Sequence, residues 1–305
     1  MTFGSGFENN IADAYRPLMQ VYEPGDWVYL FGFSRGAYTA RAPAGMLQSV
    51  DLLSPGAEHL IRYAMTYWRN DHGATSPGGI LCAEFEATLA RKCPVRFVGV
   101  WDTVGSVGYG SELLARSNSF PFTYTNPSVA HVRHAVSIDE RRHIFRQNLM
   151  APIGGQDVKN VWFAGVHANV GGGDPSAEAG LAKIAFGWMM WEAVTCGLEI
   201  DPVALDCELN WVGSPPDFRA GKHDSLKGGW WVAEFLPARQ YNWVTKARDW
   251  RISFNRARNV PRESAQSHVY LHQSVIDRIN ARVGYAPGNI PNDEATLRAR
   301  FKIEA

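Results

Sequence analysis

An apolar run that ends in Gly-x-Ser-x-Gly constrains this chain more than any other feature of its sequence. Residues 27–33 are almost all aromatic or aliphatic, and Gly32 and Gly36 flank Ser34. Such a run is typical of a buried strand, and the glycines leave room for a sharp turn from a strand into a helix. Residues 37–47 then carry small side chains at helical spacing, as a helix packed tightly on a parallel sheet requires. The pattern predicts a strand, a tight turn and a helix in succession.

Two further apolar runs end in residues that carry chemistry. Residues 95–101 precede Asp102, and residues 161–166 precede His167. The carboxyl ends of parallel strands meet at one rim of a sheet, where binding and catalytic groups gather. The alternative for Asp102 is that it only caps a turn. Residues 171–173 are three glycines with no Lys-Ser/Thr after them, so we expect close backbone approach to the candidate site and no phosphate loop.

Together these strand ends present a nucleophile, an acid and a base in chain order. A serine hydroxyl is a weak nucleophile until a histidine accepts its proton, and the histidine needs a carboxylate to orient it. We therefore predict catalytic roles for Ser34, Asp102 and His167, the order found in α/β-hydrolases. The backbone N–H of Arg35, the residue after the nucleophile, is the predicted oxyanion donor.

Composition bounds the remaining choices. A chain of 305 residues, 46% hydrophobic and 20% charged, can bury a large core. Thirty basic residues balance thirty acidic ones, so no overall field attracts nucleic acid, and nucleic acid is not an expected partner. Neither a signal peptide nor a spanning apolar run is visible. We expect a cytoplasmic protein, or one exported without a cleavable signal peptide.

Cysteines and histidines give no metal pattern. Cys82, Cys93, Cys196 and Cys207 lack Cys-x-x-Cys spacing, which favours buried free thiols. Residues 131–145 are predicted to be helical, with His131 and His134 one turn apart, but no third ligand stands at a recognisable distance. For this segment and its charged run 139–143 we prefer a solvated, salt-bridged face. No metal or organic cofactor is expected.

Two regions are predicted along the chain. Residues 1–200 would form the core with the nucleophile turn, with further helices at 58–70, 85–92 and 181–194, the last packed in the core. From residue 201 to 305 the periodicity weakens and short elements are expected in an aromatic-rich part packed on the same domain. Residues 243–262 are locally basic and aromatic, which favours a solvated basic face; peripheral membrane contact through lipid phosphate is the alternative.

Several motifs resemble the catalytic domain of the type VI secretion phospholipase effectors, an α/β-hydrolase family. The matching segments are 32–41, 99–105, 139–142, 161–167 and 170–173, with weaker likeness at 4–15 and 271–275. The resemblance implies an α/β fold with a mostly parallel sheet flanked by helices. It also implies Ser34 as nucleophile, Asp102 as acid and His167 as base, with a phospholipid ester as substrate.

The chain departs from the family pattern in two places. The family usually carries, at the front, an apolar strand that ends in Asp-Gly-Thr, and this sequence does not show one. The resemblance therefore implies a sheet without its N-terminal strands, and an early loop that gives the second oxyanion donor is missing with them. We expect self-association, or a partner chain, to cover the resulting edge. Asn169 stands where many relatives carry Asp, which removes a carboxylate but leaves the three predicted residues.

These observations favour a serine esterase or lipase that works through an acyl-enzyme. One alternative keeps the three residues but gives them a small soluble ester or thioester. Another is a catalytically silent binding or accessory module, because the front of the fold is short. Reaction of Ser34 with a fluorophosphonate would separate the enzymes from the silent module, and activity on short acyl chains without interfacial enhancement would favour the small substrate.

Overall fold

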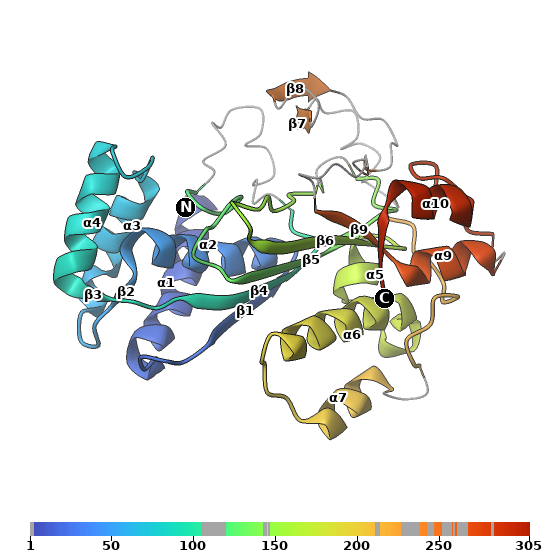
Figure 1. The fold of residues 1–305 in the computed structure, drawn as a ribbon, viewed down its shortest axis with the longest axis horizontal. Coiled ribbons are helices and arrows are strands. Elements are labelled where there is room, and N and C mark those ends of the chain that lie inside the picture. The colour runs from blue at the N-terminus through green and yellow to red at the C-terminus, as the bar shows by residue number, and fades with distance from the viewer. Residues whose placement is uncertain are drawn as a thin grey trace.

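Among the residues described below, six parallel strands form one sheet at the centre of the computed structural model (Figure 1). The structure describes residues 3–104, 120–142, 145, 147–210, 214–226, 238–242, 247–251, 258, 260, 268–281 and 284–305. In spatial order the strands are β1 (Val28–Phe33), β4 (Val95–Trp101), β5 (His131–Ser137), β6 (Asp157–Phe163), β9 (Val269–His272) and β10 (Lys302–Glu304). Two short antiparallel pairs stand apart: β2 (Leu52–Leu53) with β3 (Ala90–Arg91), and β7 (Ala238–Asn242) with β8 (Ala247–Arg251). The predicted α/β class with a parallel sheet is confirmed.

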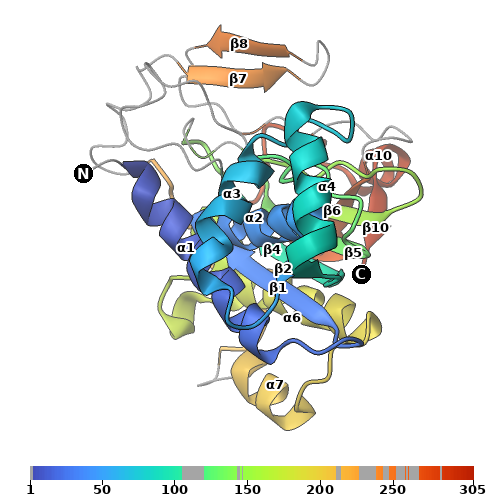
Figure 2. The ribbon, with the colours of Figure 1, turned by 90° about the vertical axis from the view of Figure 1, so that its left-hand side faces the viewer.

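Helices cover both faces of the sheet (Figures 1 and 2). On one face lie α1 (Phe3–Val21), α2 (Arg35–Val50), α3 (Ile61–Arg69) and α4 (Pro77–Leu89), which share an apolar core with β1, β4 and β5. On the other face α6 (Gly180–Thr195) packs on the sheet beside the short α5 (His167–Gly171), with α7 (Pro202–Leu209) farther out. Burial of both faces explains why β1 and β4 are near-continuous apolar runs.

The predicted helix at 85–92 begins earlier in the structure, at Pro77. Ser76 accepts a hydrogen bond from the Gly79 N–H at 3.0 Å, and Pro77 occupies the first helical position, where its missing N–H costs nothing. The segment Pro77–Gly79, which lies between the two predicted helices, is therefore the start of α4. The other predicted helices, at 58–70 and 181–194, are confirmed as α3 with a preceding 3-10 turn and as α6.

The helix predicted over residues 131–145 is wrong. Residues His131–Ser137 form β5, between β4 and β6 in the middle of the sheet. His131 and His134, three residues apart on a strand, point to opposite faces. His131 pairs with Asp157 at 2.8 Å, whereas His134 is fully buried. The two histidines therefore form neither a solvated face nor a metal pair.

Short elements make up the described parts of residues 201–305, as expected. The last strands, β9 and β10, extend the same parallel sheet beyond β6, and α9 (Gln273–Asn280) and α10 (Glu294–Arg300) pack against them. The predicted division near residue 200 stays a prediction, but both sides of it contribute strands to one sheet. Most residues of the basic and aromatic segment 243–262 are not among those whose side chains the structure describes.

The free thiols differ from expectation at one position. Cys82, Cys93 and Cys196 are buried, and Cys207 is exposed on α7. Burial raises the pKa of the Cys82 and Cys93 thiols to about 12, so neither is a thiolate near neutral pH. Among the described residues, we find no helix with the length and apolarity needed to cross a membrane.

β1 is the outermost strand on its side of the sheet as far as the chain is described. Its backbone therefore presents a row of hydrogen-bonding groups that no described strand uses, and Phe31 on this strand is 36% exposed. Unpaired strand edges favour association, and a charged side chain on the edge opposes it.

We expect the chain to self-associate through β1, and Phe31→Lys to shift it toward monomer in sedimentation velocity. Tyr63→Lys is the matched control, because Tyr63 is also an exposed aromatic residue but lies on α3. A parent chain that sediments as a monomer at micromolar concentration, or an equal shift in both variants, would contradict association through this edge.

Candidate active site

The turn after β1 has the strained geometry that its sequence predicts. Ser34 has φ 59° and ψ −120°, in the left-handed region that non-glycine residues rarely occupy, and α2 starts at the next residue. A Cβ atom on Gly32 would lie 2.3 Å from the Gly36 carbonyl oxygen, so only glycine fits there. A Cβ atom on Gly36 would meet nothing within 4 Å. The close approach therefore requires the first glycine of the motif and not the second.

The three predicted residues come together at the carboxyl ends of β1, β4 and β6. Nε2 of His167 lies 2.8 Å from Oγ of Ser34, and Nδ1 of His167 lies 2.6 Å from Oδ2 of Asp102. Asp102 is fully buried, His167 is 7% exposed and Ser34 is half-buried. Ser34 is therefore the most exposed of the three residues. Arg35, whose N–H opens α2, is exposed beside it.

Asp102 is held by donors on both of its carboxylate oxygens. Oδ1 accepts the Ser137 N–H at 2.9 Å, and Oδ2 accepts the Ser137 hydroxyl at 3.0 Å as well as the bond from His167. The guanidinium of Arg258 also donates to Oδ1. Asp102 itself has φ 42°, so its backbone is in the left-handed region too. Asp102 thus lies inside a network of hydrogen bonds, which is more than the cap of a turn.

The charge on Asp102 follows from two opposed effects. Burial alone would raise the pKa of its carboxyl, because a charge is poorly solvated inside the protein. The Arg258 guanidinium and the hydrogen bond from His167 outweigh burial and hold that pKa well below its usual range. Asp102 is therefore a carboxylate near neutral pH.

The segment after β5 fixes the backbone that carries His167. Oε2 of Glu140 accepts the His167 N–H at 3.1 Å, and Oδ2 of Asp139 accepts the Gly165 N–H at 2.7 Å. Both carboxylates are buried, Glu140 completely, and Arg142 pairs with Glu140 through two bonds of 2.9 Å. The prediction of a solvated charged face at 139–143 is therefore wrong for these two acids, which instead anchor the loop of the histidine.

Two aromatic rings enclose the imidazole of His167. The Phe33 ring centroid lies 4.6 Å from the imidazole centroid, and the Phe145 ring meets it edge-on at 4.9 Å. A Cβ atom on Gly171 would lie 1.9 Å from the Phe33 ring, so this glycine permits the close contact of α5 with β1 that the sequence suggested. The rings limit the orientations open to the imidazole and shield its contact with Asp102 from water.

Neutral groups complete the network. Burial, together with the Arg41 guanidinium, lowers the pKa of His134 to about 3, so its ring is neutral near pH 7. Nε2 of His134 accordingly accepts the N–H of Thr103, the residue after Asp102, at 3.0 Å. Asn169 accepts the Val166 N–H through Oδ1 at 3.3 Å, so the amide orders the histidine turn without adding a carboxylate.

Sequence reasoning missed Ser137, Glu140 and Arg258 as members of this site. The acid run after β5 gave a usable signal, because two adjacent acids that follow a buried strand lie at the same rim as Asp102. Arg258 gave none: it stands among other basic residues, in a segment assigned to a solvated face. In the structure it is fully buried, so that assignment is wrong for Arg258.

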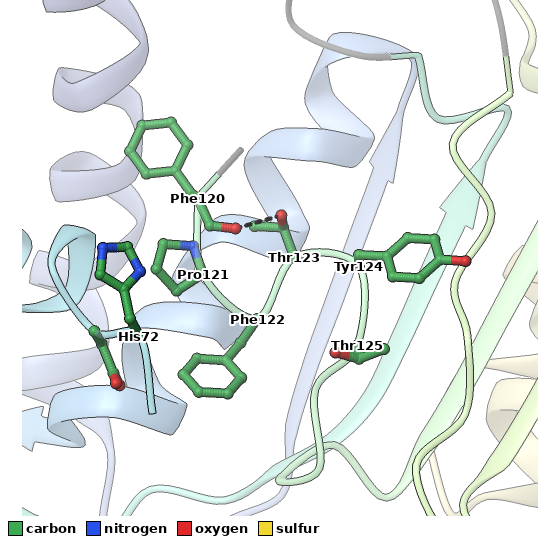
Figure 3. Close-up of a pocket in the computed structure, with 8 residues that line it drawn as sticks. His72, Phe120, Pro121, Phe122, Thr123, Tyr124 and Thr125 are labelled. Carbon is green, nitrogen blue, oxygen red and sulfur yellow. Dashed lines mark hydrogen bonds between the residues drawn. The ribbon is translucent and has the colours of Figure 1, made fainter. Parts of the chain in front are cut away.

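A cavity of about 310 Å³ lies beside residues 120–125, next to His72 (Figure 3). Phe120, Pro121 and Tyr124 line it, and it contains none of Ser34, Asp102 or His167. The amide of Phe120 donates to the Tyr38 hydroxyl on α2 at 3.2 Å, one turn beyond the start of that helix.

In the described ranges, no group of three or more His, Cys, Asp or Glu residues is placed to hold a metal ion.

Comparison with protein families identifies one family. The family model described as the catalytic domain of the Tle1-like phospholipase effectors of type VI secretion matches residues 1–192. An uncharacterized protein of Saccharomyces cerevisiae is 40% identical over 158 residues, which make up 50% of this chain and 22% of that protein.

Two solved structures are also similar. One is an uncharacterized protein from Pseudomonas aeruginosa, with 22% identity and a TM-score of 0.35 over 65% of this chain and 29% of that one. The other is the Tle1 effector bound to the VgrG spike of the type 6 secretion system, with 24% identity and a TM-score of 0.32 over 57% of this chain and 30% of that one. The matches cover less than a third of each of these three relatives.

Proposed function

Because the chain belongs to the family of Tle1-like type VI secretion phospholipase effectors, through their catalytic domain, we propose that it is a serine hydrolase that cleaves carboxylic esters of phospholipids. The observation that carries the proposal is the continuous line of contacts from the Ser34 hydroxyl through His167 to Asp102. The family supports hydrolysis of lipids, and the line of contacts supports a mechanism for it.

In the first half of the reaction Ser34 attacks the ester carbonyl carbon. His167 takes the hydroxyl proton on Nε2 as the bond from Oγ to carbon forms, and Asp102 stabilises the resulting imidazolium through Nδ1. The tetrahedral intermediate collapses when the carbon–oxygen bond to the leaving alcohol breaks, and the imidazolium returns its proton to that alcohol. An acyl group remains on Ser34.

In the second half a water molecule takes the place of the alcohol. His167 removes its proton, the hydroxide attacks the acyl carbon, and the fatty acid leaves as Ser34 regains its hydrogen. The developing oxyanion in both halves lies near the start of α2, where the Arg35 N–H and the positive end of the helix dipole favour negative charge. One such donor is worth about 10² to 10³ in rate.

The substrate class comes from the family and from the surroundings of Ser34. The half-buried Ser34 with the Phe33 and Phe145 rings close to its histidine suits an apolar acyl chain. The charges behind these residues, on Asp102, Glu140 and Arg258, are buried and in pairs. The cellular location stays a prediction, cytoplasmic or exported without a cleavable signal peptide. A lipid surface and a second copy of the chain are the proposed partners.

The proposal is tested by labelling the chain with a fluorophosphonate and by assaying two substrates. We expect labelling at Ser34 and release of fatty acid from phosphatidylcholine vesicles, with activity rising when the lipid forms an interface. Faster turnover of p-nitrophenyl acetate without interfacial enhancement would replace the lipid with a small soluble ester. Absence of both labelling and turnover would leave the chain a silent module.

A further inference from the structure

The guanidinium of Arg258 is fully buried at the back of the Ser34, His167 and Asp102 line. Its Nη1 donates to Oδ1 of Asp102 and, at 2.9 Å, to Oγ of Ser137. Its Nε and Nη2 both donate to the backbone carbonyl of Phe145, the residue whose ring meets His167. One side chain from the C-terminal part thus joins the acid to an aromatic wall of the site.

Hydrogen bonding alone does not require this residue. Without Arg258, Asp102 would still accept the Ser137 N–H, the Ser137 hydroxyl and the His167 N–H, which satisfy both carboxylate oxygens. What Arg258 adds is a positive charge inside a buried site. A buried carboxylate without a counter-charge favours uptake of a proton, and a nearby cation opposes it.

Asp102 and His167 share a short hydrogen bond and therefore take up protons as a pair. When the pair gains a proton, His167 has no lone pair free to accept the Ser34 proton, and the site is inactive as a base. The positive charge of Arg258 disfavours that added proton. Arg258, which touches no reacting atom, is therefore expected to lower the pH below which the pair is protonated and inactive.

We propose that Arg258 is a positioning residue that holds Asp102 ionised and thereby keeps the Asp102–His167 pair active as a base at lower pH. The inference rests on the proposed serine-hydrolase function and deepens it. Arg258 lies beyond the matched residues 1–192, so the C-terminal part supplies this component of the site.

Other charged groups face the pair and do not duplicate this role. Glu140 accepts the backbone N–H of His167, and its charge is matched by Arg142. His134 of β5 is neutral near pH 7, as its lowered pKa shows. Ser34 and Ser137 are the hydroxyl contacts. Arg258 is the cation that forms an ion pair with Asp102 among the described residues.

The test is the pH dependence of fluorophosphonate labelling at Ser34, which reports the free protein and needs no knowledge of the natural lipid. We expect Arg258→Met to move the acid limb of the labelling rate to higher pH by about one unit, so that labelling one unit below the parent midpoint is about tenfold slower. Arg258→Gln should move the acid limb as Arg258→Met does, because glutamine keeps hydrogen-bonding groups but has no charge. Arg258→Lys, which keeps the charge, should leave the limb near its parent position.

Arg278→Met is the matched control. Arg278 is also a buried arginine of the C-terminal part, and it donates to the carbonyl oxygens of Phe218 and Ala220, with no ion pair to Asp102. We expect it to leave the acid limb unchanged. An equal shift in this control would overturn the inference.

Two other results would overturn the inference while the proposed function stands. In the first, the neutral Arg258 variants fold, as judged by circular dichroism, and are labelled more slowly at every pH, but the acid limb of the labelling rate stays at the parent pH. That is the behaviour of a merely structural residue. In the second, both neutral variants fail to fold while Arg278→Met folds. A parent chain that is not labelled at Ser34 would instead remove the proposed function itself.

Discussion

Replacing Ser34 with alanine is expected to abolish ester hydrolysis, with a loss in turnover on the order of 10⁶-fold. The hydroxyl is the only part of the side chain that the change removes, and its contact is with Nε2 of His167 at 2.8 Å. Alanine keeps the Cβ atom at φ 59°, so the strain of the turn is the same before and after. The fold should therefore persist while the nucleophile is lost.

Turnover of a p-nitrophenyl acyl ester measures this loss, with circular dichroism to verify the fold. Thr39→Ala is the matched control: it removes a hydroxyl from α2, the helix that follows Ser34, where Oγ1 donates to the Arg35 carbonyl at 3.2 Å. The control should keep its activity. Undiminished turnover in Ser34→Ala would show that Ser34 is not the nucleophile and that hydrolysis occurs elsewhere in the chain.

The second large effect is expected from the partners of Ser34. His167→Ala removes the base, and Asp102→Asn places an amide N–H against Nδ1 of His167, which favours the tautomer whose Nε2 carries hydrogen and cannot accept the Ser34 proton. We expect a loss of about 10⁴-fold or more for each change. Because the three residues act as a unit, the double variant should lose little more than His167→Ala alone.

Asparagine suits this position as a probe, since it tolerates the left-handed backbone of Asp102 better than most residues. Asp174→Asn tests the alternative acid, because Asp174 pairs with His223 at 3.0 Å and accepts from Asn169 of the histidine turn at 3.3 Å. The measurement is kcat/KM for the same ester. Near-normal activity in Asp102→Asn together with an inactive Asp174→Asn would mean that the acid has been misassigned.

The parts of the fold that could be predicted are those specified by local sequence. β1 and β4 lie within apolar runs that lead directly into Ser34 and Asp102. β6 spans Asp157–Phe163, so it begins four residues before the apolar run 161–166 and ends three residues before that run does. Rim position and chain order nevertheless follow from the sequence itself. The turn at Ser34 could be predicted for the same reason, because its constraint is steric and acts between Gly32 and Gly36, only four residues apart.

β5 could not be predicted in this way, because its polar residues are satisfied by groups far along the chain. Arg133 is buried against Glu192 of α6, and His134 contacts Thr103 after β4. In isolation the segment resembles an exposed helix with two histidines one turn apart. Its strand character depends on the neighbours on each side, β4 and β6, which supply the backbone partners.

Arg258 illustrates the same limit for the site. A single arginine in a basic segment carries no local sign of burial, and its carboxylate partner is 156 residues away. Glu140 lies nearer, yet its role depends on the turn between β6 and α5, which brings the His167 amide to it. Pairings of this kind depend on tertiary structure, and composition or periodicity does not reveal them.

The position of β9 has a consequence for the order in which the molecule is built. β6 and β9 are neighbours in the sheet, although Asn160 and Val269, which are paired, are more than 100 residues apart in sequence. Ribosomes release the N-terminal part of a chain first, and contacts between distant residues form late because long loops must close. A nascent chain therefore carries Ser34 long before β6 gains its outer neighbour and Asp102 its counter-charge. The reactive centre matures only after synthesis has passed Arg258 and β9.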